Sequence, residues 1–171
     1  MNTAGKWLLY TLVGFALYKV ASMKRPSQSI LNYVKDIEKF GATPYQDAGG
    51  FWTIGYGHKI VPGDPYWPEG PIKEITRDQA DILFKKDTAP AARAVNVYVQ
   101  VPLSQNQYDA LFSLVYNIGS GNFLSSTLLR KLNMTDYQGA ADEFPKWRKS
   151  NGKILAGLET RRNQEREIFI A

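Results

Sequence analysis

The sequence predicts an α+β protein that is mostly helical, with a small antiparallel β-hairpin or sheet near its N-terminal third. Two capping-box patterns, "TRDQ" from Thr76 and "SQNQ" from Ser104, each open an apolar run at helical spacing. Residues 45–60 instead combine β-forming side chains with glycines, as short twisted strands do. With 171 residues, 44% of them apolar, the chain can bury the core of one domain.

Residues 1–26 are expected to form an apolar N-terminal helix and a linker ahead of a folded domain over residues 27–171. No charge interrupts the stretch from Trp7 to Tyr18, and a helix there would be apolar on every side. Extended to Met23, the stretch only just reaches the roughly 17 residues that span a bilayer. We therefore predict an uncleaved signal anchor, with a cleaved signal peptide and a buried core helix as alternatives. The positive residues after the stretch disfavour export of the domain.

A short helix is predicted next. Apolar residues recur at helical spacing over residues 30–37, and Ser27 or Ser29 can cap the first turn. Gly41 predicts that the helix ends near Phe40.

A small hairpin is predicted from Tyr45 to Ile60, followed by a loop. Four prolines between residues 62 and 71 exclude regular structure there. The rest of the chain reads as helical, with starts at Thr76, at Ser104, near Ser126 and near Asp136, and a last run from Leu158 to Ile170.

The charged residues favour anionic partners without indicating nucleic acid. The formal net charge is +5, which attracts polyanions in general. Positive residues alternate with acids in "KEITRDQADILFKKD" and "ETRRNQEREIF", a pattern typical of solvated helix faces. The chain has no cysteine, and His58 is its only histidine, so thiol chemistry is excluded and a histidine-rich zinc site is disfavoured. We expect the chemistry to come from carboxylates.

Two carboxylates in unlike surroundings flank the predicted turn. Glu38 falls in the last helical turn, where the helix dipole and apolar neighbours favour the protonated form, while Lys35 and Lys39 oppose it. Asp47 lies among polar, mobile backbone and is expected to stay ionised. Such a pair suits glycoside hydrolysis, in which one carboxyl protonates the leaving oxygen and the other activates water or stabilises positive charge. Taken singly, each residue also fits an ordinary role as a solvated or turn side chain.

Alternation along "FWTIGYGH" separates the two faces of a strand. Trp52, Ile54, Tyr56 and His58 share the face predicted to be core, where a hydrogen-bonded structural histidine is favoured over a ligand or proton shuttle. Thr53 lies on the other face beside glycines, where a substrate or a water could approach closely. An ordinary β-branched strand residue is the alternative.

The pattern Glu-x8-Asp-x5-Thr, with "TIGYGH" attached, resembles the active-site signature of bacteriophage lysozymes, the family 24 glycoside hydrolases. The similarity continues through "QNQYDALFSLVYNIGSGNF", "STLLRKLN", "GAADEFPKW" and "GLETRRNQEREIF", so it covers nearly everything after residue 27. The resemblance implies a lysozyme-like muramidase domain over residues 27–171. It also implies hydrolysis of the β-1,4 bond between N-acetylmuramic acid and N-acetylglucosamine in peptidoglycan, with neither a metal nor an organic cofactor.

The same resemblance implies roles for individual residues. Glu38 corresponds to the catalytic acid, Asp47 to the second carboxylate, and Thr53 to the residue that positions the attacking water, with inversion at the anomeric carbon. Tyr116 and Asn117, within "VYNIG", correspond to substrate-binding positions opposite the hairpin.

The apolar N-terminus is similar to that of signal-anchor-release endolysins, in which an uncleaved, weakly hydrophobic segment holds the enzyme at the inner membrane until depolarisation. This resemblance implies that residues 1–26 are such a segment and its linker. The enzyme is then expected at the periplasmic face of the host inner membrane, afterwards free in the periplasm as a monomer that lyses the host. The alternatives are a membrane-anchored module that binds peptidoglycan without cutting it, and a basic nucleic-acid-binding protein, for which no groove-reading motif is visible.

Overall fold

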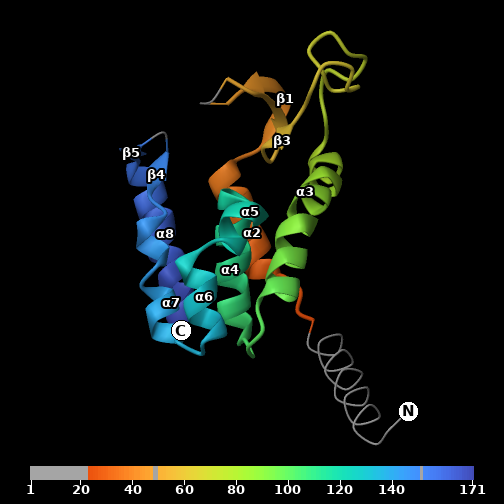
Figure 1. Cartoon of the computed structure of the whole chain (residues 1–171). Helices are drawn as coiled ribbons and strands as arrows, with labels where there is room; N and C mark the ends of the chain where they lie inside the picture. Colours follow the sequence, from red (N-terminus) through yellow and green to blue (C-terminus); the bar gives the residue numbers. More distant parts are fainter. Residues whose placement is uncertain (1–22, 48–49, 151) are drawn as a thin grey trace, which may run out of the picture.

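The computed structural model describes residues 23–47, 50–150 and 152–171. Figure 1 shows two lobes: a sheet and the proline-containing loop lie at one end, shorter helices lie at the other, and helix α3 (Arg77–Tyr98) runs between them. This is the predicted α+β architecture, mostly helical with a small antiparallel sheet. The apolar helix predicted before Met23 lies outside the described residues.

Helix α2 (Gln28–Glu38) begins at the predicted cap, because the Ser27 hydroxyl accepts a hydrogen bond from the backbone N–H of Ile30. The helix ends at Glu38, two residues earlier than predicted. The reason is the backbone of Lys39, whose φ of 60° and ψ of 161° are incompatible with a continuing helix. Gly41, predicted as the stop signal, instead begins the first strand.

The sheet has three antiparallel strands in sequence order: β1 (Gly41–Gln46), β2 (Trp52–Gly55) and β3 (His58–Lys59). The predicted hairpin therefore starts too late at Tyr45, since β1 continues back to Gly41 through a register irregularity. Gly55 has a φ of 67°, and a methyl group there would lie 3.1 Å from a buried alanine of α3. Only glycine allows β2 to pack this closely on α3.

Helix α3 begins with the predicted capping box at Thr76, whose hydroxyl accepts a hydrogen bond from the backbone N–H of Gln79. Its apolar face includes Phe84 and Val95, which are buried in the main core. One end of α3 contacts the sheet, and the helix also packs on α4. The helix therefore joins the two lobes through one continuous core.

Five further α-helices build the helical lobe. Every residue from Tyr108 to Val115 is buried, so the middle of α4 forms the centre of this lobe. The helices are α4 (Gln105–Ile118), α5 (Ser120–Leu124), α6 (Thr127–Asn133), α7 (Tyr137–Ala141) and α8 (Ala156–Ile170). The predicted starts near Ser126 and Asp136 are confirmed, since both side chains cap the following helix.

A second small hairpin was not predicted. Strands β4 (Lys149–Ser150) and β5 (Lys153–Ile154) pair antiparallel and are exposed along their length. Strands of two residues leave no alternating pattern in a sequence, which explains the omission. The hairpin lies at the end of the helical lobe that is nearer to the sheet (Figure 1). It follows a 3₁₀ turn, Phe144–Lys146.

None of the helices within the described ranges combines the length and hydropathy needed to cross a membrane.

A buried acid stabilises the lobe near α6. The carboxylate of Glu143 is 7% exposed and accepts hydrogen bonds from Lys131 Nζ at 2.7 Å and Lys146 Nζ at 2.9 Å. Burial opposes ionisation, but the hydrogen bonds and charges of the two lysines together outweigh it and hold the pKa of Glu143 below its ordinary value.

We expect Glu143→Gln to reduce the free energy of unfolding at neutral pH by about 1 kcal/mol, because the lysines are partly exposed and screened. A lowered folded-state pKa means that the carboxylate stabilises the fold fully above its ordinary value of 4.5, and that this contribution disappears as the pH falls through the folded pKa. Urea unfolding across this range should show the variant and the parent converging in acid. A constant difference at every pH contradicts the assignment.

Candidate active site

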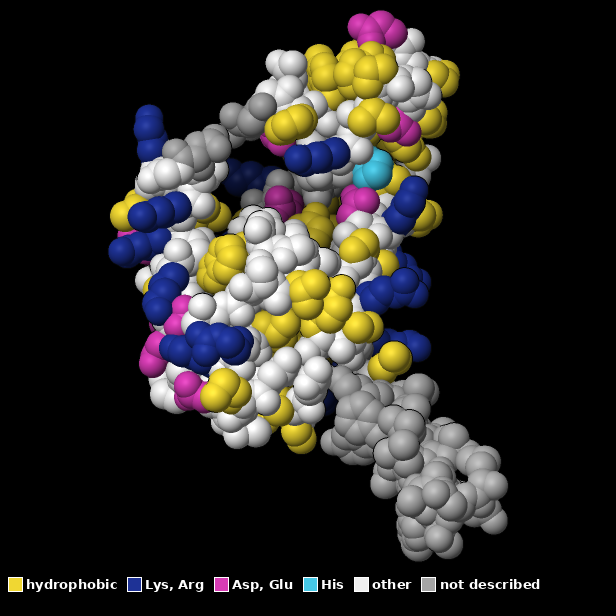
Figure 2. All heavy atoms as spheres, in the orientation of Figure 1, with side chains coloured by type: hydrophobic (Ala, Val, Ile, Leu, Met, Phe, Trp, Pro, Cys, Tyr) yellow, Lys and Arg dark blue, Asp and Glu magenta, His cyan; other side chains and the backbone are white. Residues whose placement is uncertain are grey.

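Glu38 occupies the last position of α2. Its side chain is 24% exposed. One carboxylate oxygen, Oε1, accepts a hydrogen bond from Arg161 Nη1 at 3.1 Å. The other, Oε2, lies beside Gly57, where an added Cβ would stand in ordinary van der Waals contact at 3.4 Å. The φ of 81° favours glycine at position 57, so no side chain of that residue lies against the carboxylate. Figure 2 shows the hollow between the sheet and the end of the helical lobe.

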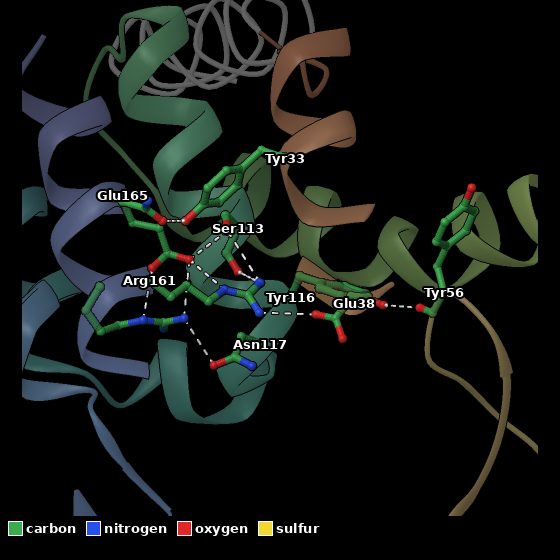
Figure 3. A network of polar contacts seen from close by, with 10 residues as sticks. Tyr33, Glu38, Tyr56, Ser113, Tyr116, Asn117, Arg161 and Glu165 are labelled. Carbon is green, nitrogen blue, oxygen red and sulfur yellow. Dashed lines mark hydrogen bonds and ion pairs between the residues drawn. The ribbon is translucent and has the colours of Figure 1, made fainter. Parts of the chain in front are cut away.

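The Arg161 guanidinium is fixed by a buried polar cluster (Figure 3). Its Nε donates to Glu165 Oε1 at 3.1 Å, and its Nη2 donates to the backbone carbonyl of Ser113 at 3.3 Å. The Ser113 hydroxyl donates to the same Glu165 oxygen at 2.6 Å. Arg161 is 4% exposed, and Glu165 and Ser113 are fully buried. Arg161 therefore has little freedom to leave Glu38.

A second arginine completes this cluster. Arg162 is fully buried, and its Nη2 donates to Glu165 Oε1 at 3.2 Å. Its Nε lies 3.1 Å from Glu165 Oε2, but without the alignment of a hydrogen bond. Burial lowers the pKa of Arg162 to about 10, so the group is still a cation at neutral pH. Burial also raises the pKa of Glu165, although the two arginines and Ser113 favour its ionised form.

Asp47 and Thr53 lie together at the end of the sheet. Tyr45 of β1 pairs with Thr53 of β2, and Asp47 follows β1 directly. The Asp47 carboxylate accepts a hydrogen bond from the backbone N–H of Phe51 at 2.9 Å. The Thr53 hydroxyl can donate to the carbonyl of Tyr45 at 3.2 Å or that of Phe51 at 3.4 Å. Both side chains are therefore held by the turn between β1 and β2.

The prediction that Thr53 lies on an open face of the strand is wrong in part. Thr53 is only 2% exposed, and Ile54 on the opposite face is fully buried. Both faces of β2 are thus covered, because this short strand contacts both β1 and α3. His58 is hydrogen-bonded as predicted, with Nδ1 2.8 Å from Asp87 Oδ2.

The side chains of the two predicted binding residues, Tyr116 and Asn117, project from α4 in different directions. The Tyr116 hydroxyl donates to the backbone carbonyl of Tyr56 at 3.4 Å. Burial, and then the charge of Glu38, raise the pKa of Tyr116, so this phenol remains a neutral donor. Asn117 is exposed, and its Oδ1 accepts a hydrogen bond from Arg162 Nη2 at 3.1 Å. Tyr116 therefore lies toward Glu38, whereas Asn117 adjoins the buried cluster.

The buried cluster was missed in the sequence. The segment "ETRRNQEREIF" was interpreted as a solvated helix face, but Arg161, Arg162 and Glu165 are all buried. A signal was present: the arginines precede the glutamate by four and three residues, a spacing that places all three on one side of a helix. The pattern could not reveal that this side faces α4.

This arrangement can perform acid–base chemistry at a sugar bond. Glu38 offers a partly exposed carboxyl with a fixed orientation, and Asp47 offers a second one from the other lobe. In the described part of the chain, no three acidic, histidine or cysteine side chains are grouped to hold a metal ion.

Comparison with known proteins agrees with this architecture. Residues 35–165 match the family "Phage lysozyme". An endolysin of Acyrthosiphon pisum secondary endosymbiont phage 1 is 43% identical over 149 residues, covering 84% of this chain and 96% of that protein. The SAR-endolysin of Enterobacteria phage P21 is 41% identical over 137 residues, covering 78% of each chain. The crystal structure of a P22 lysozyme mutant superimposes with a TM-score of 0.74 at 37% identity, covering 87% of this chain and 100% of that one.

These matches extend over most of the chain and include the helices and strands that carry the site. They agree with the lysozyme-like fold and disfavour a non-catalytic wall-binding module. The chain therefore belongs to the phage lysozyme family and is a muramidase endolysin.

Proposed function

We propose that Glu38 is the general acid that protonates the leaving oxygen when this endolysin cleaves the β-1,4 bond between N-acetylmuramic acid and N-acetylglucosamine. The observation that carries this proposal is the geometry of the Glu38 carboxylate. One carboxylate oxygen accepts a hydrogen bond from Arg161, the other lies beside Gly57, and the side chain is 24% exposed. A group that is both oriented and accessible can reach a bound sugar without rearrangement.

Asp47 is proposed as the second carboxylate, on the opposite side of the bond. Its hydrogen bond from the Phe51 backbone fixes the orientation of the carboxylate. It comes from the sheet lobe, whereas Glu38 and Arg161 come from helices. For the proposed inverting reaction, the two carboxyl groups should lie about 6.5 to 9.5 Å apart, which leaves room for the attacking water.

Thr53 is proposed to orient that water. Its single hydroxyl proton is used on a backbone carbonyl, so its oxygen is left to accept a hydrogen bond. A water that donates to Thr53 would present its lone pair in a defined direction. Tyr116 and Asn117 are proposed to contact the glycan, Tyr116 through its ring and Asn117 through its exposed side-chain amide.

Arg161 is proposed as a positioning residue for Glu38. Its charge is compensated by Glu165, and its backbone belongs to α8, which packs along α4. An arginine held from two sides presents its donors in a fixed geometry. The position of the Glu38 carboxyl is thereby fixed relative to the core of the helical lobe.

Residues 1–26 are proposed as a signal-anchor-release segment and linker, joined to a muramidase domain over residues 27–171. Supporting this, several relatives carry the name SAR-endolysin. The described end of the linker is bound to the helical lobe: Asn96 exchanges hydrogen bonds with the backbone of Lys24, and Asp109 accepts one from Ser27. The enzyme would be held at the periplasmic face of the inner membrane and then released as a monomer onto peptidoglycan.

Replacement of Glu38 by Gln should lower the clearing of permeabilised Gram-negative cells by about 10²- to 10⁴-fold, since the amide cannot donate the proton. Turbidity assays measure the loss, and circular dichroism should show an intact fold. Glu159→Gln is the matched control, because Glu159 is partly exposed on α8 and pairs only with Arg148 among the described residues. Full clearing by the Glu38 variant would end the proposal.

Replacement of Glu165 by Gln should reduce the free energy of unfolding by about 3 to 5 kcal/mol, because two buried guanidinium groups lose their counter-charge. Urea unfolding measures the change. The same substitution at Glu159 should cost less than about 1 kcal/mol. If both variants lose equally little, the buried cluster does not carry the stability assigned to it.

The full-length chain should fractionate with membranes in energised cells and become soluble after addition of an uncoupler. Immunoblotting of membrane and soluble fractions measures this transfer. A soluble periplasmic form that lacks the N-terminal residues before uncoupling would instead establish a cleaved signal.

A further inference from the structure

A concave pocket of about 500 Å³ opens beside the end of α2, separate from the carboxylate of Glu38. Its α2 side is formed by Asn32, Lys35 and Asp36, which share one helical face through their spacing, and by Lys39, which follows the last helical residue. The remaining lining comes from Phe40, Tyr56 and Arg77. The pocket thus lies where helix α2, the sheet and the start of α3 meet.

Positive charge exceeds negative charge at this pocket. Lys39 and Arg77 form no ion pair with any described carboxylate, and Lys35 is paired with Asp81 at 2.6 Å. Asp36 is the single carboxylate among the lining residues. Three cations and one carboxylate therefore line the pocket, while Asp81, outside the lining, pairs with Lys35. The two cations without an ion pair to a described carboxylate come from different parts of the fold.

The Arg77 side chain is already oriented. Its guanidinium lies 4.6 Å above the Phe40 ring, and its Nη1 is 3.4 Å from the Tyr56 hydroxyl. Stacking of this kind fixes the plane of the guanidinium and leaves other N–H groups free to donate. A planar fork of donors matches the oxygens of a phosphate group.

Lys39 is held in an unfavourable backbone conformation. Its φ of 60° and ψ of 161° belong to a region that is essentially restricted to glycine. Glycine at this position would relieve the strain, yet the chain carries a lysine that lines the pocket. Strained residues of this type gather at ligand clamps and switch regions. A strained lysine at the wall of a pocket is consistent with a ligand-contacting role for its ammonium group.

We propose that this pocket binds a phosphate-type anion, contacted by Lys39 and Arg77 with Lys35 at its edge. A tetrahedral anion offers several oxygens and can be approached from α2 and α3 at once, whereas a planar carboxylate offers two. The positive end of the α3 dipole adds to the attraction. The phosphate can belong to a soluble phosphate ester or to a lipid headgroup.

Inorganic phosphate is the first probe. At matched ionic strength in chloride, phosphate should raise the Tm of the full chain saturably. Lys39→Gly should raise the Tm without phosphate by relieving strain, but weaken phosphate binding by about tenfold, the loss of one charge-assisted contact. Arg77→Gln should weaken binding similarly. Lys85→Ala, on the exposed face of α3 outside the pocket, should bind as the parent does.

The absence of a phosphate-specific shift, or an equal shift in the parent and both pocket variants, overturns the proposal. Isothermal titration calorimetry of the same four proteins gives the affinities directly. None of these measurements uses cell-wall hydrolysis, so their outcome is independent of the roles assigned to Glu38 and Asp47.

Vesicles then distinguish the two sources of phosphate. The full chain and its Lys39→Gly variant are sedimented with phosphatidylcholine vesicles, with and without phosphatidic acid. A loss of binding by the variant that occurs only with phosphatidic acid identifies a lipid headgroup as the ligand. Equal sedimentation of both proteins that does not rise when phosphatidic acid is added, alongside a positive phosphate titration, identifies a soluble phosphate ester.

Discussion

The ion pair between Arg161 and Glu38 is the contact that ties the candidate active site to the core. Arg161 is almost fully buried, and burying a guanidinium is costly unless a counter-charge and hydrogen bonds accompany it. Glu165 and Ser113 supply both, from α8 and α4. The carboxylate at the end of α2 is therefore positioned by the same buried cluster that fixes α8 against α4. Stability and the geometry of the proposed catalytic acid share one set of side chains in this lobe.

Backbone conformations position the other residues of the candidate site relative to the pair of Arg161 and Glu38. Gly57 brings the sheet close to Glu38, and the tight turn after β1 presents Asp47 and Thr53 from the other lobe. Lys39 ends α2 in a strained conformation immediately beyond Glu38. Because α3 continues through both lobes, the two halves of the site are joined by a helix as well as by the sheet.

The sequence predicted those parts of the fold that depend on local interactions. The caps at Ser27, Thr76 and Ser104 and the helices that follow them rest on contacts within a few residues, so they are visible in the chain. Glu38, Asp47 and Thr53 could be chosen because their types and spacing form a known signature, and their roles remain predictions. The buried cluster could not be found, since a charged helix face looks the same whether it meets solvent or α4. Likewise, the pocket beside α2 depends on α3 and the sheet meeting that helix, which no local pattern records.

A double-mutant cycle between Glu38→Gln and Arg161→Gln, measured as free energies of unfolding in urea, tests the central interaction most directly. If Arg161 holds the Glu38 carboxylate as described, the double variant should be more stable than the sum of the single effects predicts, by about 1 kcal/mol or more. Additive effects, within about 0.5 kcal/mol, would show that the two groups do not interact in solution. They would contradict the claim that the buried cluster positions Glu38, the proposed catalytic acid.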